Sequence, residues 1–244
     1  QEQQGRDTCY ACAIRCKRVV EIEEDIYHVN PRFGGPEYET LAALGSYCAV
    51  GDLAAVCKAN ELCNQYGMDT ISCGGTIAWA MECYENGLIT AQDTGGVELN
   101  YGDPGVLVKM VELIATRQGF GDVLALGSQK ASEAIGRSTE NFLATCRGQE
   151  FPAHMPRVKP SLGLIYAVNP FGADHMSSDH DPIYSEPFLE RLALLGLTNP
   201  QPIQVLNEEK VRFARITQYF YSLTDSLNLC QFVWGPGFAL YGPK

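Results

Sequence analysis

Three cysteines near the start of the chain constrain its fold more than any other feature. Cys9, Cys12 and Cys16 form a C-x2-C-x3-C run, and thiols this close in sequence can bind one metal centre without help from distant residues. Thiolates favour an iron–sulfur cluster or zinc, and either centre needs a fourth ligand. Cys230 is the leading candidate, so we expect a metal to join the two ends of the chain.

The spacing favours a [4Fe-4S] cluster over zinc, because zinc ribbons usually carry a second C-x2-C pair and this sequence has none. Plain core cysteines are the third interpretation. The radical enzymes that cleave S-adenosylmethionine have the reverse spacing, so that class is disfavoured. The other cysteines lie mostly among apolar neighbours on helical stretches, and we expect them to be inert core residues: Cys48, Cys57, Cys63, Cys73, Cys83 and Cys146.

The remaining composition is that of an ordinary globular protein. The chain has 244 residues, of which 45% are hydrophobic, and a formal net charge of −11. That charge argues against nucleic acid or an anionic membrane as a partner, because phosphates are bound by clustered Lys and Arg. No stretch reaches the roughly 20 apolar residues of a membrane span, and the polar start is unlike a signal peptide. We therefore expect a cytoplasmic location, and the missing initial Met leads us to expect a fragment of a longer protein.

Helical periodicity dominates the sequence and predicts a mostly α, multihelical fold. Asp52 as N-cap and Gly67 as C-terminal stop bound a helix over residues 53–66. Other helices are expected over residues 41–50, 75–86, 104–117, 123–126, 129–135, 161–167, 188–195 and 208–223, with a short strand or exposed turn within residues 17–30. We expect one helical domain over residues 1–147, with the cysteine run, and a second over 148–244, with Cys230.

Three polar residues are candidate site residues, each with a simpler interpretation. Glu39 lies at a predicted helix start, where the helix dipole favours a carboxylate, and capping is the preferred interpretation on local grounds. His175 and His180, in the string DHMSSDHD, could ligate a metal or relay protons. A solvated polar loop is an equal alternative for both. Asp69 is expected to be a helix N-cap or turn residue.

Several of these pieces, in this order, resemble the tungsten-containing aldehyde:ferredoxin oxidoreductases over nearly the whole chain. The most specific parts are the cysteine run and the string YGMDTIS. The resemblance is carried by CYACAIRC at 9–16, EYET at 37–40, NQYGMDTIS at 64–72, PAH at 152–154, GLIYA at 163–167, GADH at 172–175 and DSLNLC at 225–230.

That family has two mostly helical domains and an N-terminal β-rich domain on which a tungsten bis-pterin cofactor rests. The resemblance implies that this chain comprises the two helical domains and has the missing domain as a partner. It implies a [4Fe-4S] cluster bound by Cys9, Cys12, Cys16 and Cys230. It implies pterin contacts from two loops of pattern D-x-x-G-(L/M)-(C/D), and it implies that Glu39 and His175 face the tungsten, or molybdenum, as catalytic acid–base groups. The pterin-contact residues would be Asn64, Gly67, Asp69, Asp225, Asn228 and Leu229.

The chain departs from the loop pattern at two positions. Asn64 replaces Asp in the first loop, and Asn228 replaces Gly in the second. Asn can still hydrogen-bond a pterin edge, as a neutral group, and it adopts a positive φ less freely than Gly. These changes leave the pterin contacts and the substrate open, but they do not affect the cluster.

The resemblance implies oxidation of a small aldehyde to its carboxylic acid, with electrons passing through the cluster to ferredoxin. Arg15, Lys17 and Arg18 are candidates for a basic contact with ferredoxin, and a merely solvated surface is the alternative. By itself the chain is expected to lack the pterin and to be inactive. Two other functions stay open: a non-catalytic iron–sulfur electron-transfer module, and a family relative that reduces an aromatic thioester.

Overall fold

The computed structural model describes residues 3–24, 26–185 and 192–235 of the chain. They fall into two compact units, Gln1–Ala153 and His154–Lys244. The units divide at Ala153 rather than at residue 147, and their correspondence to the two expected domains stays a prediction. No helix in the described ranges is long and apolar enough to cross a membrane.

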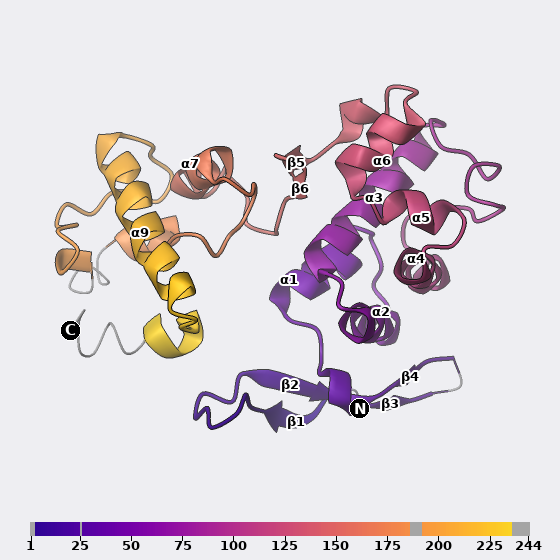
Figure 1. Cartoon of the computed structure of the whole chain (residues 1–244), viewed down its shortest axis with the longest axis horizontal. Helices are drawn as coiled ribbons and strands as arrows, with labels where there is room; N and C mark the ends of the chain where they lie inside the picture. Colours follow the sequence, from indigo (N-terminus) through magenta and orange to yellow (C-terminus); the bar gives the residue numbers. More distant parts are fainter. Residues whose placement is uncertain (1–2, 25, 186–191, 236–244) are drawn as a thin grey trace. The chain divides into compact units, whose positions relative to one another are not determined.

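The described elements are mainly helices, which confirms the predicted mostly α, multihelical fold (Figure 1). Three two-stranded antiparallel ribbons accompany them: β1 with β2, β3 with β4, and β5 with β6. In order, the first unit contains β1 (Gln3–Asp7), β2 (Lys17–Val20), β3 (Ile22–Glu23), β4 (His28–Val29), α1 (Tyr38–Thr40), α2 (Leu53–Tyr66), α3 (Thr70–Glu85), α4 (Pro104–Thr116), α5 (Phe120–Leu124), α6 (Ser128–Ile135), β5 (Thr145–Cys146) and β6 (Gln149–Glu150). The second unit contains α7 (Pro160–Val168) and α9 (Glu208–Ser226).

Helix α2 begins and ends where the sequence predicts. The Asp52 carboxylate accepts a hydrogen bond from the Ala55 main-chain N–H at 3.0 Å, and Gly67 ends the helix with φ of 68°. Glycine adopts this left-handed conformation without the steric cost that a Cβ brings. The two cap residues therefore set the length of α2.

Helix α3 begins at Thr70, earlier than the expected start at residue 75. Asp69 is its N-cap, as expected, and accepts from the Ser72 main-chain N–H at 2.7 Å. Gly74 was expected in the connector before the helix, but it lies inside α3. A Cβ on Gly74 would lie 2.5 Å from the main-chain carbonyl of Ala43, so this glycine allows close packing between two helical segments.

The segment that α3 approaches is a π-helix, Leu41–Ser46, which continues directly from α1. Its main-chain hydrogen bonds span five residues: Tyr47 N–H donates to the Ala42 carbonyl at 2.9 Å, and Val50 N–H to the Gly45 carbonyl at 2.9 Å. The helical stretch expected over residues 41–50 is therefore a π-helix over Leu41–Ser46. π-Helical turns are rare and occur frequently at functional sites.

Each unit has its own apolar core. In the first unit, α3 and α4 contribute Ile77, Met81, Leu107 and Met110, all fully buried. In the second unit, α7 and α9 contact each other, and the rings of Tyr184 and Phe213 stack with centroids 4.8 Å apart. Half of the helix expected over residues 188–195 lies outside the described residues, which resume at 192.

Candidate functional site

The three clustered cysteines lie on the loop that joins β1 to β2. The loop is shaped by its own polar groups: Cys12 N–H donates to the Cys9 carbonyl at 3.1 Å, and the Thr8 hydroxyl donates to the carbonyls of Cys9 and Cys12. All three thiols are free, with Cys9 and Cys16 exposed and Cys12 half-buried. Three accessible thiols on one short loop fit a soft metal centre such as an iron–sulfur cluster.

The other cysteines differ from this loop in burial. Cys48, Cys57, Cys63, Cys73 and Cys83 are buried, whereas Cys146 is half-buried and lies on β5 rather than on a helix. Burial raises the pKa of the Cys48 thiol to about 12, and burial followed by the charge of Glu82 does the same for Cys83. A hydrogen bond with Cys63 and burial raise the pKa of Cys73. These thiols stay protonated, which makes them poor metal ligands.

The two loops of the predicted pterin pattern are the same kind of helix ending. At the end of α2, Met68 N–H donates to the Cys63 carbonyl at 2.8 Å around the left-handed Gly67. At the end of α9, Leu229 N–H donates to the Thr224 carbonyl at 2.9 Å around Asn228, whose φ is 54°. This arrangement is the Schellman motif, and Asn is the residue that most often replaces Gly in it. Asn228 replaces the glycine of the loop pattern but keeps the backbone conformation that the glycine would adopt.

The last residue of the loop pattern is Asp69 in the first loop and Cys230 in the second. It has an equivalent position in the two loops but a different role. Asp69 caps α3 with its carboxylate. Cys230 is exposed, and its carbonyl accepts from Trp234 N–H at 2.8 Å, which starts a further helical turn. The thiol of Cys230 is thus presented at the start of a turn, as the Asp69 carboxylate is.

A cavity of about 640 Å³ lies beside the first of these loops, within the first unit. Asn64 and Asp69 line it, as does the following Thr70. Basic side chains contribute part of the wall: Lys17, Arg18 and Arg32. A cavity with amide, hydroxyl, carboxylate and cationic groups suits a polar ligand that offers both donors and acceptors.

Asn60 also lines this cavity. It lies one turn before Asn64 on α2, and its side-chain oxygen and carbonyl both accept from the Asn64 amide, at 3.2 and 3.0 Å. Asn60 is only 3% exposed, and within the described residues its Nδ2 group has no hydrogen-bond partner. A buried donor without a partner costs about 1–3 kcal/mol, and a ligand acceptor in the cavity would remove that cost. The cavity therefore fits the polar edge of a pterin.

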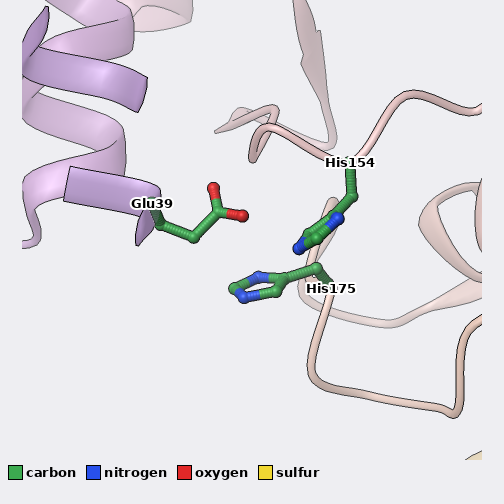
Figure 2. Close-up of side chains that lie close together, drawn as sticks. All are labelled: Glu39, His154 and His175. Carbon is green, nitrogen blue, oxygen red and sulfur yellow. The ribbon is translucent and has the colours of Figure 1, made fainter. Parts of the chain in front are cut away.

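Glu39 lies in the first turn of α1, directly before the π-helix, and Figure 2 shows its side chain projecting from that helix. Its carboxylate accepts from the Ala153 main-chain N–H at 2.7 Å. The carboxylate therefore binds a residue far away in sequence, and its place in the first turn of α1 is also one where the helix dipole favours a carboxylate. Thr40 fixes the same turn through a 2.8 Å contact between its hydroxyl and that of Thr70.

His175 lies in the second unit among two other histidines. The rings of His154 and His175 stack with centroids 4.9 Å apart, as Figure 2 shows, and the His180 ring lies 4.6 Å from that of His154. Asp179 and Asp181 in the same segment are buried. The alternative of a solvated polar loop is therefore wrong for this segment.

Hydrogen bonds link this histidine segment to the end of α9 within the second unit. The Gln231 side chain donates to the Met176 carbonyl at 2.7 Å, and the Tyr221 hydroxyl donates to the Asp179 carboxylate at 2.6 Å. The loop of Cys230 and the loop of His175 are thus attached to each other.

Sequence reasoning missed three residues of these sites: Asn60, His154 and Lys159. The Lys159 ammonium lies 2.9 Å from His154 Nδ1 and 3.2 Å from His180 Nδ1. Asn60 could have been found from its position one helical turn before Asn64. The pairing of Lys159 with two histidines depends on tertiary structure and has no local signal.

Comparisons with known proteins agree with this geometry. A family model described as "Aldehyde ferredoxin oxidoreductase, domains 2 & 3" matches residues 1–242. The chain is 37% identical over 230 residues to the tungsten-containing aldehyde ferredoxin oxidoreductase of Pyrococcus abyssi, covering 92% of this chain and 35% of that protein. It is 26% identical over 235 residues to an aliphatic sulfonate oxidoreductase, WOR-like subunit, of Pyrococcus furiosus, covering 94% of this chain and 33% of that protein.

One solved structure shares the fold. It is the active site complex BamBC of benzoyl coenzyme A reductase, matched with a TM-score of 0.62 and 22% identity over 89% of this chain and 31% of that chain. The chain spans about a third of the length of the curated relatives it matches.

Proposed function

Because the chain belongs to the aldehyde ferredoxin oxidoreductase family, we propose that it is the cluster-binding and pterin-facing part of an enzyme that oxidises aldehydes to carboxylic acids. The observation that carries the proposal is the α2–α3 loop, which combines the family's loop pattern with a polar cavity and an unpartnered buried amide at Asn60. A tungsten bis-pterin, when bound, would supply the oxygen-transfer chemistry, and a [4Fe-4S] cluster the one-electron steps.

Cys9, Cys12, Cys16 and Cys230 would ligate the cluster. Free, accessible thiols support this assignment for the three residues of the β1–β2 loop. Cys230 is also free and exposed, and it directly follows the hydrogen-bonded turn that ends α9. The four together complete the ligand set of a cubane cluster.

The pterin would contact the two helix-ending loops. In the first loop Asn64 and Asp69 line the cavity, with Gly67 turning the chain between them. In the second, Asp225 and Leu229 flank the turn at Asn228. The neutral amides of Asn60 and Asn64 would bind pterin groups by hydrogen bonding, beside the charged groups of the same cavity.

Glu39 and His175 would move protons at the metal. His175 is 16% exposed through its side chain, and its Nδ1 lies 4.0 Å from the Asp174 carboxylate. A partly buried imidazole near a carboxylate is suited to general acid–base work near neutral pH. Glu39 has a fixed carboxylate orientation because the Ala153 N–H holds one oxygen.

Ferredoxin would be the electron acceptor, in the cytoplasm. Arg15, Lys17 and Arg18 lie on or beside the cysteine loop, and they offer a local positive charge on a chain of net charge −11. Long-range attraction between opposite charges speeds such encounters and weakens with salt. The missing β-rich domain would complete the pterin site.

The test is metal and activity analysis of the intact protein, purified without oxygen from its natural source. We expect tungsten with iron, and aldehyde-dependent reduction of a viologen dye. Iron without tungsten would instead indicate an electron-transfer module, and zinc alone a structural site. Turnover of an aromatic thioester in place of aldehydes would indicate the reductase alternative, whose fold this chain shares.

A further inference from the structure

Lys159 lies at the centre of a histidine network within the second unit. Its ammonium contacts Nδ1 of both His154 and His180, at 2.9 and 3.2 Å. An ammonium is a donor only, so each Nδ1 must accept. In the neutral form of each ring, the proton therefore resides on Nε2. The contacts of one lysine thus require the same tautomer in both histidines.

The ring of His180 connects Lys159 to the main chain of His175. Its Nε2 lies 2.7 Å from the His175 carbonyl oxygen, to which Nε2–H donates. Both ring nitrogens of His180 are therefore used, one by Lys159 and one by His175. Burial lowers the pKa of His180, the charges of Lys159 and the neighbouring histidines lower it further, and the bond to the His175 carbonyl acts in the opposite direction. The lowered pKa favours the neutral form that this arrangement requires.

The ring of His154 contacts both Lys159 and the ring of His175. The two rings are stacked, with centroids 4.9 Å apart and planes inclined at 28° (Figure 2). The main chain of His154 is held by the Tyr166 hydroxyl, which donates to its carbonyl at 3.0 Å. The main chain of His154 is therefore held by α7, and its ring contacts Lys159.

We propose that Lys159 is a positioning residue for His175: it fixes the Nε2–H tautomer of His154, whose ring stacks on that of His175, and it holds the ring of His180, whose Nε2–H donates to the His175 carbonyl. The role of His175 in proton transfer rests on the proposed function, whereas the tautomers do not. The simpler alternative is a lysine that only stabilises the fold. Under that alternative the tautomer of His154 would not depend on Lys159.

The experiment is NMR of the histidine ring nitrogens in this chain, which has four histidines. The fourth, His28, lies in the first unit on β4 and contacts Glu23, so it serves as an internal reference. In the wild type we expect His154 and His180 as Nε2–H tautomers. In Lys159→Met we expect His154 to become a tautomer mixture, whereas the His175 carbonyl keeps His180 as the Nε2–H tautomer. Lys159→Arg, which keeps a cationic donor, should restore the wild-type pattern of His154 at least in part. Lys130→Met, at an exposed lysine of α6, should leave all four unchanged.

The wild-type spectrum alone can overturn the proposal. If His154 or His180 carries its proton on Nδ1, or if Lys159→Met folds and leaves the His154 tautomer unchanged, Lys159 does not position these rings. If Lys159→Met does not fold, Lys159→Gln replaces it, with the same two outcomes.

A kinetic readout in the intact protein separates this proposal from the proposed function. We expect Lys159→Met to lower kcat for aldehyde roughly 10- to 100-fold with little change in KM, because misplacement of an acid–base group slows chemistry more than binding. Altered tautomers in an intact protein that does not oxidise aldehydes would refute the function and keep the positioning role. Altered tautomers with unchanged kcat in an active enzyme would refute the positioning role.

Discussion

Lys210 and Asp181 form an ion pair fully closed off from water, with their charged groups 2.6 Å apart and no exposed surface on either side chain. The Asp181 carboxylate also accepts from the main-chain N–H groups of Ser161 and Leu162 in the first turn of α7. Asp181 directly follows His180 in sequence. The pair therefore attaches α9 and α7 to the segment that carries the candidate catalytic histidine.

We predict that Lys210→Met lowers the free energy of unfolding by about 3–5 kcal/mol, because it leaves a buried carboxylate without its counter-charge. Urea denaturation of the chain measures the loss. The matched control is Lys109→Met, which breaks an exposed pair with Glu112 at 3.4 Å and should cost about 0–1 kcal/mol. Equal losses in the two variants would contradict the role of the buried pair.

Gly74 is predicted to be intolerant of any side chain. Its Cβ would lie 2.5 Å from the Ala43 carbonyl group, and overpacking of this kind costs about 1–3 kcal/mol. Gly74→Ala should therefore lower the thermal midpoint of unfolding, although alanine favours helices. Gly51→Ala is the control, since a Cβ there meets nothing within 4 Å. A stabilised Gly74→Ala variant would show that the close approach of α3 to the π-helix is not needed.

The left-handed residues of the two loops give a further prediction. Asn228→Gly should leave stability unchanged or raise it slightly, whereas Asn228→Ala should cost about 1 kcal/mol, because the αL conformation disfavours a plain Cβ. Gly67, with φ of 68°, should tolerate Asn better than Ala in the same denaturation assay. A different order at the two positions would mean that the loops are not equivalent.

Cluster assembly tests the cysteine assignment. After anaerobic reconstitution with iron and sulfide, we expect roughly four irons per chain and an absorption band near 400 nm that bleaches with dithionite. Cys12→Ser should lose most of the iron, and Cys146→Ser should keep it. The assignment of Cys12 fails if its serine variant assembles the same cluster, or if the wild type takes up only zinc.

His180 gives the chain a predictable response to acid. Its pKa is lowered from the ordinary 6.5 in the folded state, so below that pH the unfolded chain binds a proton more readily than the folded chain. Stability is then present above pH 6.5 and is lost as the pH falls towards the folded pKa. His180→Gln should flatten the dependence of unfolding free energy on pH in this range. If the slope of unfolding free energy against pH is unchanged in His180→Gln, His180 is not the source of the pH dependence.

The parts of the structure that local chemistry determines were predictable. Asp52 and Gly67 set the ends of α2, Asp69 caps α3, and the cysteine spacing is a property of one loop. The start of α3 was not predictable, because Gly74 is used for a contact with Ala43 that the sequence does not reveal. The same holds for Lys159, whose partners His154 and His180 are brought to it by the fold of the second unit.

The endings of α2 and α9 place the last residue of each loop where its side chain is not needed for the turn itself. In both loops the turn is made by one left-handed residue and two main-chain hydrogen bonds, none of which involves the side chain at the last position. That position is occupied by a carboxylate in one loop and a thiol in the other, at Asp69 and Cys230. A substitution at Cys230 would therefore change the proposed cluster ligand while the main-chain turn stays as it is, whereas a substitution at Asp69 would also remove the carboxylate that caps α3.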